Sequence, residues 1–131
     1  MAFSHAYLKT CSDRRRCWSA KGTQLGDWYV HLKHGVDVVS NEDLERVKFS
    51  SPDIVYVPDT DDLLDMIDNQ IAAWGEDPSE KKLTIACDAK GIWSVEVHFA
   101  GRIVQSTQAE SIHMALLGAV GQMVVFKMDP K

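Results

Sequence analysis

The chain has 131 residues, of which 45% are hydrophobic and 25% charged, and its formal net charge at pH 7 is −5. This length suits one domain with at most a small appendage, and the composition is that of a globular protein, which excludes a wholly disordered chain. Residues 1–50 carry 8 Lys/Arg against 6 Asp/Glu, whereas residues 51–131 carry 6 against 13. Nucleic-acid binding through the carboxyl-terminal part is therefore disfavoured, because Lys and Arg must replace phosphate counterions.

The cysteines and apolar stretches indicate a cellular compartment. The three cysteines, Cys11, Cys17 and Cys87, are an odd number, which argues against a secreted disulfide framework. The longest apolar stretch, residues 114–126, is shorter than the roughly 20 residues that span a bilayer. Residues 1–5 lack the basic and apolar regions of a secretory signal. We expect a cytoplasmic protein that does not bind membranes.

The first half of the chain predicts a small β-rich region. Residues 1–25 have no clean period and are expected to form an irregular or briefly helical lead. A β-hairpin is predicted by alternating residues over 28–32, a turn at Gly35 and a β-branched run over 36–39. A hydroxyl at Ser40 followed by Asp43 predicts a capped helical turn, and residues 54–57 predict a strand that Pro58 ends. Residues 26–58 therefore predict a hairpin with a short helix and a strand.

The second half predicts an α-β-β-β-α unit over residues 59–131. A helix begins at Asp59 or Thr60 and ends at Gly75, since its apolar residues recur every three or four positions: Leu63, Ile67, Ile71 and Trp74. Alternating segments at 83–87, 93–99 and 102–106 predict an antiparallel meander. Thr107-Gln108-Ala109-Glu110 has the form of a capping box and predicts a last helix over 108–125. The fold class is α+β, and the meander is expected to pack on helices in one compact domain with 26–58.

Three resemblances rest on these segments. The meander and last helix resemble those of HicB-type antitoxins. The likeness lies in Gly91-Ile92-Trp93 on one strand and in a strand that returns toward Thr107-x-x-Glu110 before an Ala/Leu-rich helix. With the preceding helix, the order also resembles the αβββα double-stranded-RNA-binding architecture. The entry Val57-Pro58-Asp59-Thr60 and the residues up to Ile67 resemble small phage and prophage proteins. The last resemblance implies mobile-element biology, including inhibition of host defence.

Basic and metal-ligating residues gather in the amino-terminal part. Arg14, Arg15 and Arg16, followed by Trp18, could hold a phosphate or stack on a base, although short charge runs are more often solvated surface. Cys11 and Cys17 with His31 and His34 supply enough ligands for a tetrahedral zinc site, although the cysteine spacing is wider than in a zinc knuckle. The alternative to that site is a pair of ordinary thiols and two surface histidines.

A second candidate surface lies on the meander. If one sheet face is open, a polar surface is expected there from Ser94, Glu96 and His98 with Arg102 or Val104, and its titrating group is His98. Trp28 is a candidate aromatic anchor, because partly exposed tryptophans are enriched at binding surfaces. The chain contains no Gly-x-Ser-x-Gly, His-Glu-x-x-His or phosphate-binding loop. The sequence thus gives no positive indication of an enzyme or of a cofactor.

The functional prediction is a non-catalytic binding protein, encoded by a phage or mobile element, that occupies a partner protein or sequesters a small charged ligand. The partner is expected to be a protein or a small anion. Its ligand-binding candidates are Arg14, Arg15, Arg16, Trp28, His98 and Arg102. The alternatives are a small Cys/His metal-site protein or enzyme and a nucleic-acid binder that uses the arginine cluster. Gly118 and Gly121, which allow close helix approach, and the open sheet edges predict a homo-oligomer.

Overall fold

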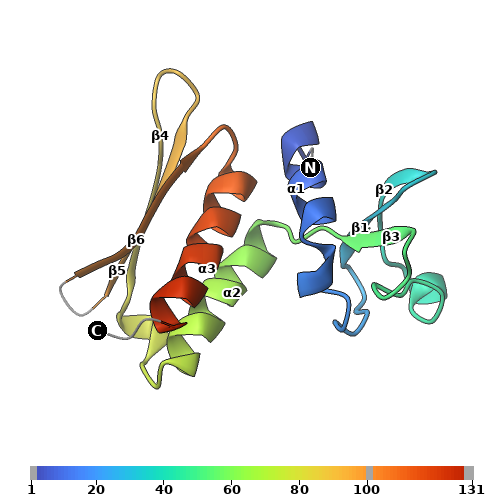
Figure 1. Ribbon diagram of the computed structural model, residues 1–131, viewed down its shortest axis with the longest axis horizontal. Helices are drawn as coiled ribbons and strands as arrows, with labels where there is room; N and C mark the ends of the chain where they lie inside the picture. Colours follow the sequence, from blue (N-terminus) through green and yellow to red (C-terminus); the bar gives the residue numbers. More distant parts are fainter. Residues whose placement is uncertain (1–2, 100–101, 129–131) are drawn as a thin grey trace. The chain divides into compact units, whose positions relative to one another are not determined.

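The computed structural model describes residues 3–99 and 102–128, and leaves out the side chains of 102, 104–106 and 124–128. The described chain has an α+β fold, as predicted. It divides into two compact units, Met1–Asp59 and Thr60–Lys131, which we call unit 1 and unit 2. The division falls between the small sheet and the first long helix (Figure 1), and the packing of residues 26–58 with 59–131 in one compact domain stays a prediction.

Unit 1 begins with a helix inside the segment that the sequence predicts to be irregular or briefly helical. Helix α1 (His5–Asp13) is capped by Ser4, whose hydroxyl accepts the Tyr7 N–H at 3.1 Å. Its buried side chains are Tyr7 and Cys11, one turn apart, and a single 3₁₀ turn, η1 (Arg15–Cys17), follows. Two buried residues in nine are too few to draw a visible apolar stripe, so the sequence alone does not decide between an irregular and a briefly helical segment.

The sheet of unit 1 confirms the predicted hairpin and strand. Strands β1 (Trp28–His31), β2 (Gly35–Val38) and β3 (Ile54–Tyr56) are antiparallel in the order β2-β1-β3. Gly35 has a φ of +86°, which a glycine adopts without strain at the end of the tight turn. Between β2 and β3 lies η2 (Asn41–Asp43), where Ser40 and Asp43 form the capping box that the sequence predicted.

Unit 2 begins with α2 (Thr60–Ala73), whose limits agree with the prediction. Leu63, Ile67 and Ile71 are fully buried along one stripe, and Gly75 follows with a φ of +83°. A 3₁₀ turn, η3 (Pro78–Glu80), leads into the sheet, and Asp77 caps it through the Ser79 N–H.

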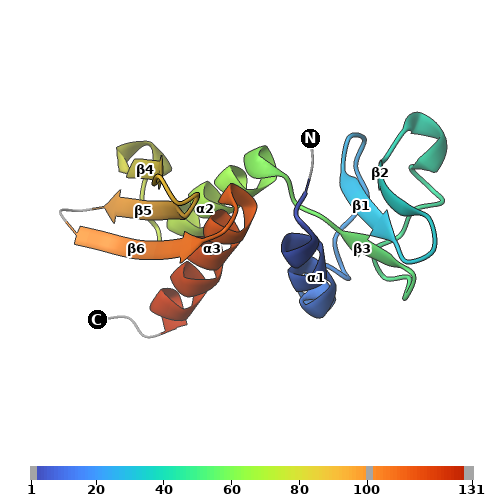
Figure 2. The same cartoon turned by 90° about the horizontal axis from the view of Figure 1, so that it is seen from above.

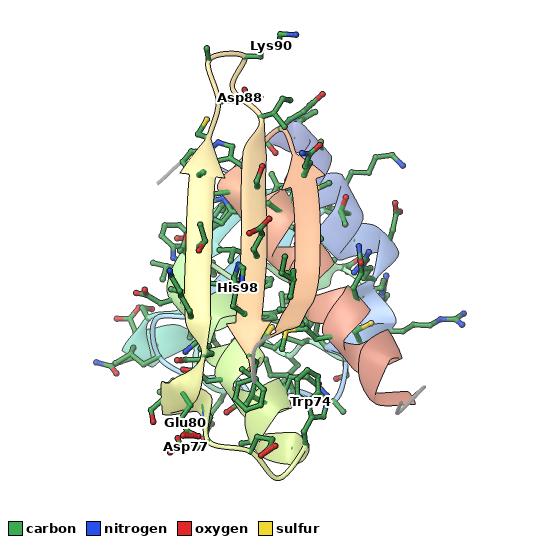
Figure 3. All side chains as sticks on the ribbon, turned by 90° about the vertical axis from the view of Figure 1, so that its left-hand side faces the viewer. Trp74, Asp77, Glu80, Asp88, Lys90 and His98 are labelled. Carbon is green, nitrogen blue, oxygen red and sulfur yellow. The ribbon has the colours of Figure 1, made fainter. Side chains whose placement is uncertain are left out.

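The sheet of unit 2 is the predicted meander. Strands β4 (Lys82–Cys87), β5 (Trp93–Phe99) and β6 (Arg102–Ala109) are antiparallel in the order β4-β5-β6. Helix α3 (Ile112–Met128) packs on α2, β5 and β6, so both helices cover one face of the sheet (Figure 2). Val95, Val97 and Phe99 point toward this helix-covered face and are buried. The other face is open (Figure 3).

The predicted start of the last helix is wrong. Residues 107–109 belong to β6, where Thr107 pairs with Val95 and Ala109 with Trp93. The Thr107 hydroxyl does not cap a helix but donates a hydrogen bond to the Ala115 carbonyl at 2.7 Å. The helix begins at Ile112, and the Ser111 hydroxyl accepts the Met114 N–H at 3.2 Å. Within the described ranges, no helix is both long enough and apolar enough to cross a membrane.

Gly118 has a role other than the predicted approach of a second copy. A Cβ atom built on Gly118 would lie 3.4 Å from Cγ2 of Thr107. Gly118 therefore faces Thr107 of β6 inside unit 2, where a methyl group would make only an ordinary van der Waals contact. It gives no support to an oligomer formed through this position.

Candidate ligand-binding cavity

The arginine cluster does not form one free anion site. The Arg15 guanidinium donates to the Pro52 carbonyl at 3.0 Å and to the Ser51 carbonyl at 3.5 Å, so it ties η1 to the loop before β3. Arg14 ends α1, with its backbone N–H bonded to the Thr10 and Cys11 carbonyls. Arg14 and Arg16 are exposed.

The other ligand candidates lie in different units. Trp28 in unit 1 is half-buried and meets the ring of Phe3 edge-on, with 5.5 Å between the centroids, which is a packing contact. His98 in unit 2 lies on the open face of β5, where its Nε2 is 3.0 Å from Oε1 of Glu96 (Figure 3). Arg102 pairs with Phe99 through its backbone, and its side chain lies outside the described part of the chain.

The four residues of the alternative metal site do not converge. Cys11 is buried within unit 1, and burial raises the pKa of its thiol to about 11, whereas a metal ligand must be a thiolate. Cys17 is exposed. The rings of His31 and His34 are adjacent, with centroids 4.5 Å apart. Among the residues that the structure describes, no three His, Cys, Asp or Glu side chains are grouped to hold a metal ion.

His31 and His34 instead line a cavity of about 380 Å³ on the hairpin of unit 1. Its lining combines polar and apolar side chains with one glycine: Tyr29, His31, His34, Gly35, Asp37, Arg46, Val47 and Ile54. Tyr29, Asp37 and Arg46 were not predicted. The alternation of β1 and β2 could have indicated Tyr29 and Asp37, which are cross-strand partners on one face of the sheet.

The local fold holds the two histidines at the cavity wall. His31 is the last residue of β1 and pairs with Gly35 on β2 and with Ile54 on β3. The turn closes because the His34 N–H donates to the His31 carbonyl at 3.1 Å. The Lys33 N–H donates to Nδ1 of His31 at 3.1 Å, so the neutral ring carries its hydrogen on Nε2 and has a donor there.

The positive charge at the cavity is already compensated within unit 1. The Arg46 guanidinium donates to Oδ1 of Asp43 in an ion pair, and this bond raises the pKa of Arg46. The same bond is the largest cause that lowers the pKa of Asp43, followed by hydrogen bonds from Ser40. Arg46 is therefore partly neutralised before any ligand arrives.

The negative charge at the cavity is not compensated in this way. Asp37 accepts the Val38 N–H at 2.8 Å and has no ion-pair partner among the described residues. The pKa of Tyr29 is raised, chiefly by burial and then by the charges of Asp37 and Asp43, which Arg46 opposes. The phenol therefore stays protonated, and the field at its hydroxyl is negative. This field favours a positively charged group in the cavity.

Comparisons with models of protein families, with curated proteins and with solved structures give no match for this chain.

Proposed function

We propose that the protein is a non-catalytic binding protein whose unit 1 cavity holds a small organic cation. The observation that carries the proposal is the lining of the cavity, in which the Asp37 carboxylate has no ion-pair partner among the described side chains, whereas Arg46 is paired with Asp43. A volume of about 380 Å³ suits a small molecule, since ligand pockets measure roughly 300 to 1,000 Å³. The predicted anionic ligand fits this charge balance less well.

The remaining groups define the rest of the ligand. The ring of Tyr29 supplies an aromatic face, which attracts alkylammonium groups, and the rings of His31 and His34 add flat wall beside it. The Tyr29 hydroxyl and the Nε2–H of His31 are donors, so an oxygen acceptor beside the cationic group would be recognised. Val47 and Ile54 supply apolar surface for a short alkyl part. The ligand class is therefore a small ammonium compound with a hydroxyl or carbonyl oxygen.

Isothermal titration with choline, and with butyrate as an anion of similar size, tests the proposal. Choline is expected to bind and butyrate is not. Asp37→Asn keeps an oxygen that can accept the Val38 N–H but removes the charge, and is expected to weaken choline binding by about tenfold, which is about 1.4 kcal/mol. The matched control is Glu45→Gln, an exposed residue outside the cavity lining, with an affinity change below about twofold. Binding of butyrate alone, or equal choline affinity in both variants, would refute a cation site.

A further inference from the structure

Strand β4 is an outer strand of the unit 2 sheet, and half of its backbone groups have no partner. The Asp88 N–H donates to the Ile92 carbonyl at 3.0 Å, next to the regular β4–β5 register that pairs Lys82 with His98 and Ala86 with Ser94. Hydrogen-bonded pairs alternate in antiparallel ladders, so the N–H and C=O groups of Leu83, Ile85 and Cys87 point away from β5. No described residue binds these groups on that side.

The two faces of β4 carry different side chains, with large apolar residues on the helix-covered face and polar or small residues on the open face. Leu83 and Ile85 pair with the buried Val97 and Val95 of β5, so they lie on the helix-covered face, where they are only half-buried. Lys82, Thr84 and Ala86 lie on the open face and are exposed. An added strand would therefore extend the polar face with polar residues and the apolar face with apolar ones.

A second copy of β4 matches the side chains of the first on both faces of the sheet. An antiparallel pair with Ile85 opposite Ile85 of the second copy places Leu83 opposite Cys87 and Thr84 opposite Ala86. It also places Lys82 opposite Asp88 of the second copy, at both ends of the ladder and on the open face. Opposite charges that face each other across strands stabilise the pair.

Other registers are less favourable. If the second copy were shifted by one residue, backbone groups of one β4 that point away from β5 would face groups of the other β4 that point toward its own β5. The shift would also place apolar side chains of one copy on the polar face of the other. A register with Ala86 opposite Ala86 places Lys82 opposite Lys90, so like charges meet. A register with Thr84 opposite Thr84 leaves Lys82 opposite Ala86 and loses both charge pairs. The charges of β4 and its turn thus select the register centred on Ile85.

We propose that two copies of this chain pair through β4 in this register and form one continuous six-stranded antiparallel sheet. The ladder contributes about six backbone hydrogen bonds, two for each of three hydrogen-bonded pairs. It places Leu83, Ile85 and Cys87 of both copies in one apolar row beside the helices. This proposal does not depend on the cation cavity, which lies in unit 1.

The edge of unit 1 offers a contrast. Strand β2 is also an outer strand, but the Val38 N–H, which its register directs outward, is bonded to the carboxylate of Asp37 at 2.8 Å. A carboxylate that accepts the hydrogen bond of an outward N–H hinders the addition of another strand at that edge. Two copies of Asp37 would also repel each other. Strand β4 carries no such block among its described residues.

Sedimentation equilibrium of the full chain is the first test. We expect a dimer, and Lys82→Glu is expected to weaken it by about tenfold or more, because both charge pairs become repulsive. The control is Lys48→Glu, an exposed residue of unit 1 that carries the same change of charge and leaves the dimer unchanged. A monomer at all concentrations, or equal weakening by both variants, would overturn the proposal.

Disulfide trapping tests the register independently of stability. In a chain with Cys17 and Cys87 replaced by alanine, residues 84 and 86 of opposite copies form a non-hydrogen-bonded pair with about 4.5 Å between Cα atoms, within disulfide range. A mixture of Thr84→Cys and Ala86→Cys chains is expected to form the mixed disulfide. Cross-linking of either variant with itself, or of neither combination, would show that the strands do not pair in this register.

Discussion

Replacing Tyr7 with phenylalanine is expected to destabilise unit 1, because the hydroxyl joins α1 to the residues after β3. Tyr7 is fully buried, and its hydroxyl donates to the Pro58 carbonyl at 2.5 Å. Pro58 is itself buried. Phenylalanine keeps the ring but leaves that carbonyl without its donor and removes the hydrogen bond between the Tyr7 hydroxyl and the Cys11 side chain. A buried group that loses its partner costs about 1 to 3 kcal/mol, and we expect a loss of unfolding free energy in this range.

The most direct assay is the labelling rate of Cys11, one turn further along the same helix. Its thiol is buried, so a reagent reaches it only when α1 opens. A loss of 1 to 3 kcal/mol would raise the open population, and with it the labelling rate, about 5- to 150-fold. Mass spectrometry of peptides separates this thiol from Cys17 and Cys87, which are exposed.

Thr10→Ala is the control within the same helix. Its hydroxyl donates to the Ala6 carbonyl on the exposed side of α1, so we expect a change within about 0.5 kcal/mol. If Tyr7→Phe changed the Cys11 labelling rate no more than Thr10→Ala does, the hydrogen bond to Pro58 would not hold α1 in place. The amino-terminal segment would then not be an integral part of unit 1.

Three further results are expected. Burial raises the pKa of Cys11 from about 9 to about 11, so the stability that its protonated thiol contributes is complete below pH 9. The free energy of unfolding then falls by at most about 3 kcal/mol as the pH rises toward 11. Urea titrations in this alkaline range should show the fall in the wild type, and Cys11→Ala should remove it. The pKa of Asp43 is lowered, so its contribution to stability is present above the ordinary carboxyl range and is lost on acidification. The difference in unfolding free energy between the wild type and Asp43→Asn should therefore shrink steadily below pH 4. A difference that stays constant would exclude this linkage. Gly118→Ala should raise the melting temperature and stabilise the protein by about 0.5 to 1 kcal/mol, because alanine favours the helix and the new Cβ meets Thr107 at an ordinary contact distance of 3.4 Å. A lowered melting temperature would show that the Cβ does not fit against Thr107.

The elements that the sequence predicted correctly are those whose limits are set by local chemistry. Helix α2 has three buried apolar residues in one stripe, and a glycine takes up a positive φ just after its end. The hairpin β1–β2 has alternation and a glycine at its turn. In both cases the neighbouring residues alone determine the conformation, so no knowledge of distant contacts is needed.

The cavity could be predicted only in part, for the opposite reason. Tyr29, His31 and Asp37 share one face of a predicted hairpin, and alternation alone places them together. Arg46 reaches the cavity from the chain after η2, and its charge is set by the pair with Asp43. Such a contact depends on how the chain returns over the sheet. The ligand that we propose therefore has the opposite charge to the anion that the basic amino-terminal composition predicted.

The capping box at Thr107 shows how tertiary pairing overrides a correct local pattern. Thr107 and Glu110 have the spacing of a helix start, but a cap contributes only about 1 kcal/mol. Ending β6 before Thr107 would remove the pairing of residues 107–109 with 93–95 and the bond from the Thr107 hydroxyl to the Ala115 carbonyl. Ser111 supplies another cap four residues later, so the chain keeps the longer strand without losing a capped helix. A hydroxyl near a strand end therefore indicates a helix start reliably only where no second hydroxyl follows within a turn.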